Sequence, residues 1–259
     1  MAATYLDAIL AHHRERAAAD KRSLDVLVDQ ARACVPPRGF ITALRNTPHL
    51  AVISEFKRKS PSKGVLNANM QPDVVARLYQ AGGASCLSVL TDAPHFGGSV
   101  DDLQQARSAC ELPVLRKDFT VDPRDVCDAR IMGADCVLLI AAALSKTQLS
   151  EFLYLAHHVD IDALVEVHDE SELAVALECG ASLVGVNQRD LVTFSVDHER
   201  AVRMGSAIPA ACVKVAESGV RGRADAESLR AAGYDAVLVG EHLVTSASIT
   251  DAVTELCVP

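Results

Sequence analysis

The sequence lacks a Cys-x-x-Cys pair, a membrane-length apolar run and a signal peptide. Its eight cysteines are scattered, and several lie inside apolar runs, which is typical of small buried thiols in a reducing compartment. The longest apolar stretch, residues 136–144, has about half the length of a membrane span. Residues 1–16 have neither the basic start nor the apolar block of a signal peptide. These absences predict a cytoplasmic protein without a transmembrane helix.

An excess of positive charge, tryptophan and metal-ligand spacing are missing as well. The 259 residues carry 25 Lys and Arg against 34 Asp and Glu, so nucleic acid is not expected as the main partner, although a local site for a small anion is compatible with this balance. The absence of Trp excludes no fold, but it leaves a low fluorescence background. The histidine pairs at 12–13 and 157–158 point to different sides of a helix, so no metal site is predicted.

What the sequence does contain is an internal repeat. Four segments each begin with Gly, continue with a short polar step and end in a continuous apolar run: 83–90, 133–140, 180–186 and 233–239. The Gly fits the end of a helix, and the apolar run fits a strand that is buried on both faces. Four more apolar runs complete a set of eight strand candidates: 50–56, 112–115, 163–167 and 211–215.

Amphipathic helical segments separate these runs, at 73–81, 100–109, 123–132, 145–158, 170–179, 198–204 and 222–232. Eight such units in a chain of this length predict an α/β protein with a closed (β/α)8 barrel, a TIM barrel. An open, doubly wound sheet is the structural alternative. It would usually place a Gly-rich phosphate loop after the first strand, and residues 54–60 contain no Gly.

The remaining residues precede the first strand. We expect residues 1–48 to form an N-terminal helical extension of one or two helices that packs on the barrel, so that residues 1–259 form a single domain. The chain ends soon after the eighth unit, so no fused second enzyme is expected. A monomer or a weak homo-oligomer is expected.

Charged residues recur where the predicted strands end, which is where a barrel carries its active site. Glu55 and Lys57 are two residues apart at the first strand end, so they share one face of the strand. For this segment alone, a solvated strand end with a basic loop is an equal alternative. Later strand ends add Lys117, Glu166, Asn187 and Glu217. Converging acids and lysines shift one another's pKa values, as acid/base catalysis requires.

The seventh and eighth strand ends carry glycines, Gly219 and Gly240. Barrels of this type often bind phosphate at these two loops together with a short extra helix. Glycine lets the backbone approach an anion closely, and free N–H groups at a helix start can receive it. The plain alternative is that both glycines only make tight turns. The sequence predicts a phosphate site here.

Taken together, these motifs resemble the indole-3-glycerol phosphate synthase family. The resemblance covers nearly the whole chain and rests on residues 38–40 with 43–44, 55–64, 115–119, 164–168, 185–191 and 216–220. It implies a carboxy-lyase of tryptophan biosynthesis. The substrate would be a small anionic phosphosugar, 1-(2-carboxyphenylamino)-1-deoxyribulose 5-phosphate, and the reaction would close its indole ring. Carbon dioxide and then water are lost, giving indole-3-glycerol phosphate. It also implies that no metal or organic cofactor takes part.

The resemblance assigns catalytic roles to the strand-end residues. Lys117 would be the general acid of ring closure, and other cations and an apolar wall are expected to lower its pKa. Glu166 would be the acid/base partner for the hydroxyl and the dehydration. Lys57, paired with Glu55, would contact the phosphate and assist late steps. Which of these groups acts at each step stays open. The orienting hydrogen-bond partners would be Asn187 and Glu217.

The resemblance also assigns binding roles. Arg189 would hold the substrate carboxylate through its planar fork. Phe119 and Leu138 would wall the aromatic ring, and the basic segment 58–63 would form a mobile loop over the anionic substrate, with Ser60 nearest the pocket. The sugar and phosphate site would consist of Ser218, Gly219, Gly240 and the backbone of Glu241.

Two positions depart from the family pattern. Gln188 stands where the family often has Asn, but this position alternates away from the site, so little effect is expected. Glu241 stands where the family often has Ser, and its carboxylate would repel a phosphate unless it turns outward.

Three alternatives compete with this interpretation. A phosphoribosylanthranilate isomerase-like barrel would need a Cys near the first strand end, and none is near. The α subunit of tryptophan synthase is a second related barrel. A non-catalytic phosphosugar-binding barrel could keep Gly219 and Gly240 but would not need Lys117 or Glu166.

Overall fold

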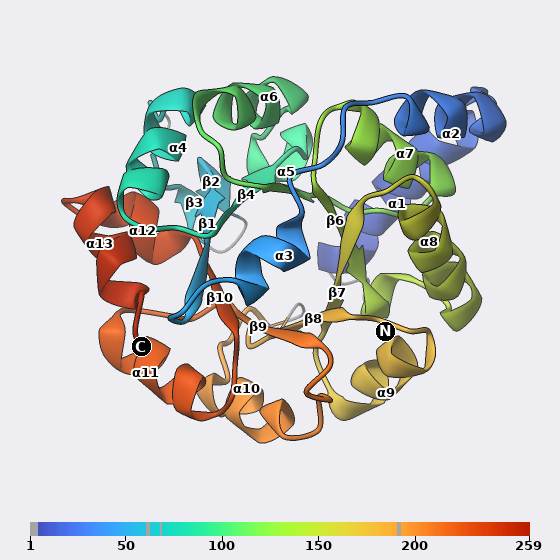
Figure 1. Cartoon of the computed structure of the whole chain (residues 1–259). Coiled ribbons are helices and arrows are strands. Elements are labelled where there is room, and N and C mark those ends of the chain that lie inside the picture. Colours follow the sequence, from blue (N-terminus) through green and yellow to red (C-terminus); the bar gives the residue numbers. More distant parts are fainter. Residues whose placement is uncertain (1–4, 61–62, 68, 191–192) are drawn as a thin grey trace.

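Eight parallel strands close into a barrel in the computed structural model, which describes residues 5–60, 63–67, 69–190 and 193–259 (Figure 1). The strands are β1 (Ala51–Phe56), β4 (Cys86–Leu90), β5 (Val114–Lys117), β6 (Cys136–Ile140), β7 (Asp162–Val167), β8 (Leu183–Asn187), β9 (Val213–Glu217) and β10 (Ala236–Val239). Ser54 of β1 pairs with Val239 on one side and with Leu87 on the other, which closes the ring. The predicted TIM barrel is confirmed.

The strands form because their apolar runs are buried on both faces. Alternate residues of each strand point into the barrel or out towards the helices. Ile53 and Leu115, for example, belong to the inner cluster, whereas Val52 and Leu87 pack under the helices. The repeated glycine ends the preceding helix: Gly133 has a φ of 97°, and its N–H donates to the carbonyl oxygen of Arg130. Only glycine adopts this left-handed backbone without strain.

Helices surround the barrel (Figure 1). They are α4 (Pro72–Ala81), α6 (Val100–Ala109), α7 (Pro123–Ile131), α8 (Lys146–His158), α9 (Glu170–Glu178), α10 (His198–Gly205), α11 (Arg223–Ala231) and α13 (Ile249–Leu256). All but α13 were predicted from the sequence to within two residues. Elements outside that prediction are the hairpin of β2 (Lys59–Ser60) and β3 (Gly64–Val65), the short helices α5 (Ala93–Phe96) and η1 (Ala141–Ala143), and α13. The short helix α12 (Glu241–Thr245) is the extra helix expected after the eighth strand.

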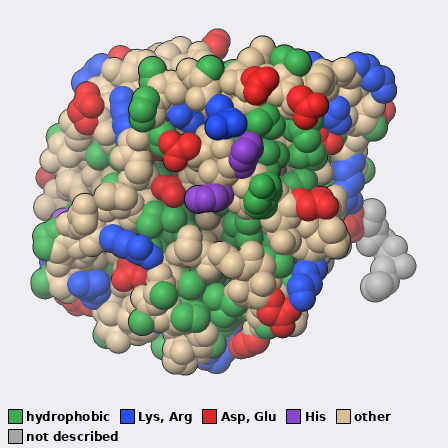
Figure 2. Space-filling view, turned by 45° about the vertical axis from the view of Figure 1, so that its right-hand side comes forward, with side chains coloured by type: hydrophobic (Ala, Val, Ile, Leu, Met, Phe, Trp, Pro, Cys, Tyr) green, Lys and Arg blue, Asp and Glu red, His purple; other side chains and the backbone are tan. Residues whose placement is uncertain are grey.

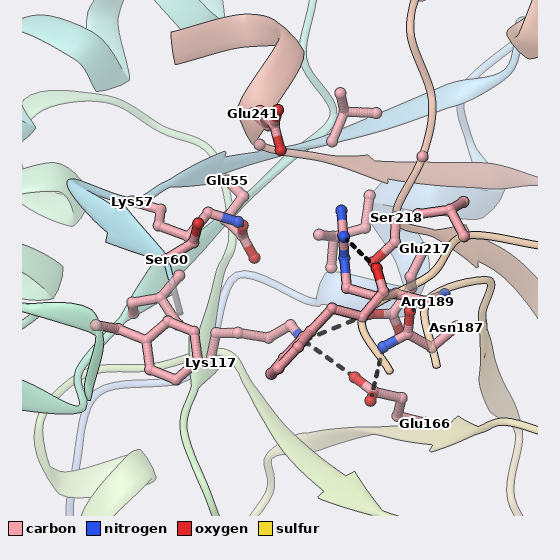
Figure 3. A pocket seen from close by; sticks show the side chains of 18 of the residues that line it. Glu55, Lys57, Ser60, Lys117, Glu166, Asn187, Arg189, Glu217, Ser218 and Glu241 are labelled. Atoms are coloured by element: carbon pink, nitrogen blue, oxygen red, sulfur yellow. Dashed lines mark hydrogen bonds and ion pairs between the residues drawn. The ribbon is translucent and has the colours of Figure 1, made fainter. Parts of the chain in front are cut away.

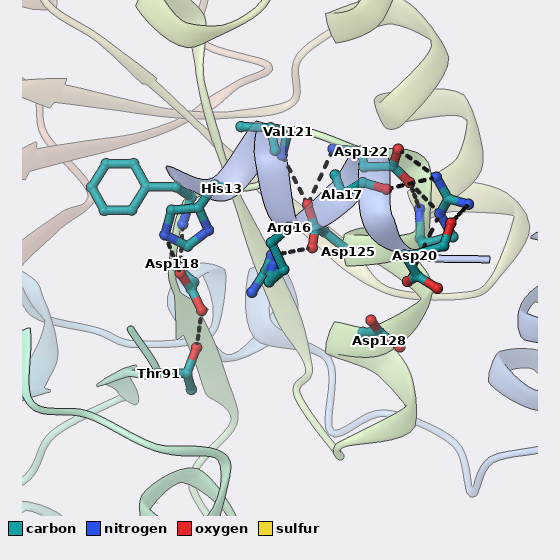
Figure 4. A network of polar contacts seen from close by, with 12 residues as sticks. His13, Arg16, Ala17, Asp20, Thr91, Asp118, Val121, Asp122, Asp125 and Asp128 are labelled. Atoms are coloured by element: carbon teal, nitrogen blue, oxygen red, sulfur yellow. Dashed lines mark hydrogen bonds and ion pairs between the residues drawn. The ribbon is translucent and has the colours of Figure 1, made fainter. Parts of the chain in front are cut away.

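The chain before β1 forms three helices rather than one or two: α1 (Tyr5–Ala19), α2 (Leu24–Arg32) and α3 (Phe40–Arg45). The first lies on the side where the strands end. Arg14 Nη2 donates to the carbonyl oxygen of Ala143 at 2.9 Å, and Arg16 Nη2 donates to Asp125 Oδ1 at 2.7 Å (Figure 4). These contacts attach α1 to the loops that follow β5 and β6.

The third helix covers the opposite end, where the strands begin. Phe40 and Leu44 are fully buried against the inner cluster of the barrel. The backbone N–H of Ile41 donates to Asp162 Oδ2 at 2.9 Å, at the first residue of β7. Burial of two large side chains and this hydrogen bond hold α3 in place as a plug. The extension therefore contacts both ends of the barrel.

The two ends of the barrel sequence meet at this plugged end. The N–H of Leu50, just before β1, donates to the carbonyl oxygen of Val258 at 2.7 Å.

On the face seen in Figure 2, acidic and basic side chains are interspersed. Within the described part of the chain, no helix is long and apolar enough to cross a membrane.

Candidate active site

A cavity of about 560 Å³ opens at the C-terminal ends of the barrel strands. Every residue predicted for the site lines it: Glu55, Lys57, Ser60, Lys117, Phe119, Leu138, Glu166, Asn187, Arg189, Glu217, Ser218, Gly219, Gly240 and Glu241. Figure 3 shows the charged members facing one another across this cavity. The closed barrel therefore brings together side chains from distant parts of the sequence.

The Lys117 ammonium lies between two carboxyl groups from other strands (Figure 3). Its Nζ is 3.0 Å from Glu166 Oε2 and 3.4 Å from Glu217 Oε2. Burial alone would lower the pKa of Lys117, but the charges of Glu166, Glu217 and Glu55 outweigh it and raise that pKa above its ordinary value. The expected lowering by neighbouring cations is therefore wrong. The nearest charges in space are negative.

Glu166 is held as an ionised carboxylate. Burial would raise its pKa, but the Lys117 ammonium, His168 and the Asn187 amide together lower it below its ordinary value. Asn187 Nδ2 donates to Glu166 Oε1 at 3.0 Å, and His168 Nε2 lies 3.3 Å from the same oxygen. Three strands thus converge on one carboxylate.

His168 was absent from the predicted set. Burial lowers the pKa of His168, but the carboxylates of Glu166 and Glu172 raise it to about 10, so the imidazole is a cation at neutral pH. Its Nδ1 lies 3.1 Å from Glu172 Oε2. The signal was present in the sequence, because Glu166 and His168 have the same i, i+2 spacing at a strand end as Glu55 and Lys57.

The pKa of Glu217 is shifted in the opposite direction to that of Glu166. Burial, together with the charges of Glu166 and Glu55, raises the pKa of Glu217 to about 8 despite the nearby Lys117. It therefore keeps its proton to a higher pH than an ordinary glutamate does. Among the described residues, no group is within hydrogen-bond distance of its Oε1. Gly185 makes room for it, since a Cβ there would collide with Glu217 Oε1.

Glu55 and Lys57 form the pair expected from their spacing. Lys57 Nζ donates to Glu55 Oε1 at 2.5 Å. A Cβ at Gly240 would lie 2.5 Å from the same oxygen, so the missing side chain lets the end of β10 approach Glu55 closely. The C-terminal ends of β1 and β10 thus form one wall of the cavity.

Backbone of unusual conformation lines the proposed phosphate end. Ser218 and Gly219 have φ values of 66° and 78°, and Ser218 is one of few non-glycine residues with a left-handed backbone. Such strain is concentrated at functional sites. Glu241, at the first position of α12, points towards Lys63, with Oε1 3.6 Å from Nζ. This cation offsets the carboxylate that stands at the rim.

Apolar side chains form the rest of the lining. Phe119 and Leu138 come from β5 and β6 and their ends, as expected, and the ring of Phe96 lies 6.2 Å from that of Phe119. Tyr5 and Ile9 of α1 also line the cavity. They were not predicted, because nothing in the N-terminal sequence indicates where that helix docks.

Polar anchors hold the loop after β8. The N–H of Arg189 donates to Asn187 Oδ1 at 3.0 Å, and its Nη1 donates to the carbonyl oxygen of Phe194 at 3.0 Å. Gln188 turns away from the cavity, as expected, and donates through Nε2 to the carbonyl oxygen of Ser218 at 2.8 Å. Leu191 lies outside the described residues.

The basic segment 58–63 only partly faces the cavity. Ser60 and Lys63 line it, whereas Arg58 turns away. Arg58 forms two hydrogen bonds with Asp102, at 2.6 and 2.8 Å, and its guanidinium lies 4.9 Å from the centre of the Phe56 ring. The expectation that the whole segment covers an anionic substrate is wrong for Arg58, because its guanidinium is hydrogen-bonded to the buried carboxylate of Asp102. Pro61 and Ser62 lie outside the described residues.

Comparisons with known proteins show which family the chain is similar to. A model of the family described as indole-3-glycerol phosphate synthase matches residues 6–256. "Indole-3-glycerol phosphate synthase 2" of Streptomyces coelicolor is 53% identical over 218 residues, 84% of each chain. "Indole-3-glycerol phosphate synthase" of Mycolicibacterium smegmatis is 47% identical over 256 residues, 98% of this chain and 94% of that one.

Solved structures of lower similarity share the fold alone. A 3-hexulose-6-phosphate synthase is 14% identical with a TM-score of 0.62, covering 80% of this chain and 98% of that chain. A thiamine phosphate pyrophosphorylase from Pyrococcus furiosus is 16% identical with a TM-score of 0.59, covering 80% and 93%. Their likeness adds no argument about chemistry. With a family match along nearly its whole length and relatives of high identity, the chain belongs to the indole-3-glycerol phosphate synthase family.

Proposed function

We propose that this chain converts 1-(2-carboxyphenylamino)-1-deoxyribulose 5-phosphate into indole-3-glycerol phosphate, carbon dioxide and water. The observation that carries this proposal is the charged Lys117, held between Glu166 and Glu217 at the ends of three strands. A reaction with several proton transfers needs a proton donor and carboxyl groups with different pKa values, and Lys117 lies beside two such groups.

Lys117 is the general acid of ring closure. The ring carbon that bears the carboxylate attacks the carbonyl carbon of the sugar chain, and the carbonyl oxygen takes a proton from Lys117. The carboxylate then leaves as carbon dioxide, and its bonding electrons return to the ring. The raised pKa keeps Lys117 charged at neutral pH, so the donor form is fully populated, although the same shift makes the ammonium a weaker acid than an ordinary lysine. Three acids around it favour its reprotonation.

Glu166 and Glu217 serve the later steps. The hydroxyl formed by ring closure takes a proton from Lys57 and leaves as water, and the adjacent carbon loses a proton to a base. Glu166, ionised beside His168, is the base. Glu217, which keeps its proton to a higher pH than an ordinary glutamate does, orients the hydroxyl together with the Asn187 amide. The pair of Lys57 and Glu55 assists the dehydration from the opposite wall.

Substrate binding divides the cavity into three regions. The phosphate lies among Ser218, Gly219, Gly240 and the backbone of Glu241, with Lys57 as its cation. Arg189 binds the carboxylate until it leaves. The aromatic ring packs on Phe119 and Leu138, and Ser60 faces the sugar.

We further propose that residues 1–259 act as one domain without a metal or organic cofactor in the reaction, as a cytoplasmic monomer or weak homo-oligomer. The helices that contact both barrel ends support a single domain. Interspersed surface charge supports the expectation that nucleic acid is not a partner (Figure 2).

The direct test supplies the carboxyphenylamino-deoxyribulose phosphate and follows indole fluorescence. The chain has no Trp, so the protein contributes little background. Phosphoribosylanthranilate is supplied in parallel to test the isomerase alternative. Indole formation with the first compound alone is expected. Folded protein that binds the first compound without converting it would favour the binding-barrel alternative and overturn the proposal.

A further inference from the structure

Two histidines and an aspartate converge beside the cavity, outside the groups used above. His13 belongs to α1, and His95 belongs to α5, whose first turn is capped by Asp92. His13 Nε2 and His95 Nδ1 each lie 2.9 Å from Asp92 Oδ2. One candidate ligand atom of each residue lies within 4.8 Å of the other two. Figure 4 shows His13 at this end of α1, next to Asp118.

Asp92 and His13 are the buried members of this cluster. The Asp92 side chain is 1% exposed, and its ion-pair partners among the described residues are the two histidines. A buried carboxylate needs a positive partner. His13 is also buried, and its Nδ1 has no hydrogen-bond partner in the described part of the chain. Asp92 Oδ1 accepts hydrogen bonds from the N–H groups of His95 and Phe96, so Oδ2 is the oxygen that faces the two imidazoles. Of the cluster's buried polar side-chain atoms, His13 Nδ1 is the one without a partner in the described residues.

We propose that His13, Asp92 and His95 bind one divalent transition-metal ion of the zinc type. Two imidazoles and a carboxylate are a donor set that zinc takes, with a fourth position left for water. Bonds of about 2.0 to 2.1 Å to a tetrahedral ion place ligand atoms about 3.3 Å apart, so the two 2.9 Å pairs need to open only slightly.

Both histidines can bind the ion without gaining or losing a proton, because each can move its hydrogen to the other ring nitrogen. A neutral histidine that ligates through one nitrogen carries its hydrogen on the other. His13 ligates through Nε2 and carries its hydrogen on Nδ1, which has no acceptor among the described residues, so binding of the ion must offset the cost of one buried, unpaired N–H. His95 ligates through Nδ1. Its side chain is 20% exposed, which gives the ion a route from solvent.

Binding would fasten α1 to the loop after β4. This contact is next to the cavity, because the His13 ring lies 5.3 Å from that of Phe119, and Phe96 directly follows His95. The ion takes no part in the ring closure. It would fix the position of a helix that contributes Tyr5 and Ile9 to the lining. His13 and His95 are 82 positions apart in the sequence, whereas the expectation of no metal site rested on the adjacent histidine pairs.

The test titrates Zn²⁺ into tag-free, chelator-treated full-length protein by calorimetry, and Co²⁺ by visible absorption. One site with tetrahedral Co²⁺ bands is expected. His95→Ala should weaken that site by at least about 100-fold, beyond the effect of an outer-sphere substitution. His12→Ala is the matched control, since His12 lies 5.9 Å from His95 ring to ring but is not a ligand, and it should bind as the parent does.

A structural readout distinguishes this site from the free thiols. Zn²⁺ should slow hydrogen exchange in α1 of the parent and of His12→Ala, but not of His95→Ala. His13→Gln would repeat the loss where it folds. Equal Zn²⁺ affinity of the parent and His95→Ala would overturn the proposal, and so would the absence of a one-to-one site in the parent. Either result would leave a purely hydrogen-bonded cluster.

Discussion

The two ends of the barrel both bury acids, but they treat them differently. At the end where strands begin, Asp135 is fully buried and both its oxygens are used. Oδ1 accepts from the Arg38 N–H and from Arg107 Nη2, and Oδ2 accepts from the Val114 N–H, each at 2.8 Å. At the end where strands finish, Glu217 is equally buried but leaves Oε1 without a partner in the described residues.

This difference separates structural acids from reactive ones. A carboxylate saturated by backbone N–H groups and an arginine is held in one charge state and one position. A carboxyl group that shares one lysine with two other acids has a shifted pKa and spare hydrogen-bonding capacity. Burial alone does not distinguish Asp135 from Glu217; the unpartnered oxygen of Glu217 and its raised pKa do.

Replacing Lys117 with Met should have the largest effect. It removes the proton donor, so kcat should fall by about 10³- to 10⁴-fold, measured by indole fluorescence, while circular dichroism stays unchanged. Lys59→Met is the matched control at the same end, because Lys59 Nζ donates to the carbonyl oxygen of Pro94 and does not line the cavity. Normal turnover by the Lys117 variant would contradict its assigned role.

Glu166→Gln should be the next most damaging change. It keeps the shape but removes the base, so kcat should fall by about 10²- to 10³-fold with a much smaller change in KM. Steady-state kinetics at several substrate concentrations separates the two. Exposed Glu178→Gln serves as control. A change in KM alone would mean that Glu166 only binds.

Asp135→Asn tests the opposite end. It removes the carboxylate partner of the partly buried Arg107 and one of the two buried oxygens that accept from backbone N–H groups, so the free energy of unfolding should fall by about 3 kcal/mol, measured by urea denaturation. The kcat of the folded protein should stay unchanged. Asp73→Asn, which breaks an exposed pair with Arg77, should cost less than about 1 kcal/mol. If Asp135→Asn abolished turnover in folded protein, the proposed division between the two ends would fail.

Over a single pH unit, the pH dependence of stability should show the smallest effect. The pKa of Glu217 rises from 4.5 to about 8 on folding, so between these values the folded state holds a proton that the unfolded chain releases. Stability should therefore fall as pH rises, by up to about 1.4 kcal/mol per pH unit. His168, whose pKa rises from 6.5 to about 10, acts in the same direction only at higher pH.

Urea denaturation between pH 5 and 6 largely isolates Glu217, because His168 loses its proton in the unfolded chain mainly above this range. Glu217→Gln cannot titrate, so its stability should depend less on pH than that of the parent in this range. Equal slopes for both proteins would show that Glu217 is ionised in the folded state. That outcome would remove the contrast with Glu166.

The barrel and most of the site were predictable from the sequence. Continuous apolar runs such as 50–56 specify strands buried on both faces, and eight of them leave few alternatives to a closed barrel. Closure then brings the strand ends together, so Lys117, Glu166 and Glu217 had to meet. Glu55 and Lys57 pair because their spacing on one strand places them side by side.

Other features depend on which groups become neighbours in space. The direction of the Lys117 pKa shift follows from three acids on other strands, and sequence order does not rank their distances. Arg58 is drawn away by Asp102, which lies 44 positions further along. Tyr5 enters the cavity only because α1 docks on loops that form much later in the chain.

The hydrogen bond between Leu50 and Val258 has a consequence for synthesis. The first strand needs the last one beside it, and the N–H that precedes it needs a carbonyl group next to the C-terminus. A chain emerging from the ribosome therefore carries β1 with one edge open until β10 and Val258 have been made. The long-range pairing makes closure a late event, and an unpaired edge of this kind exposes a nascent barrel to association with other chains.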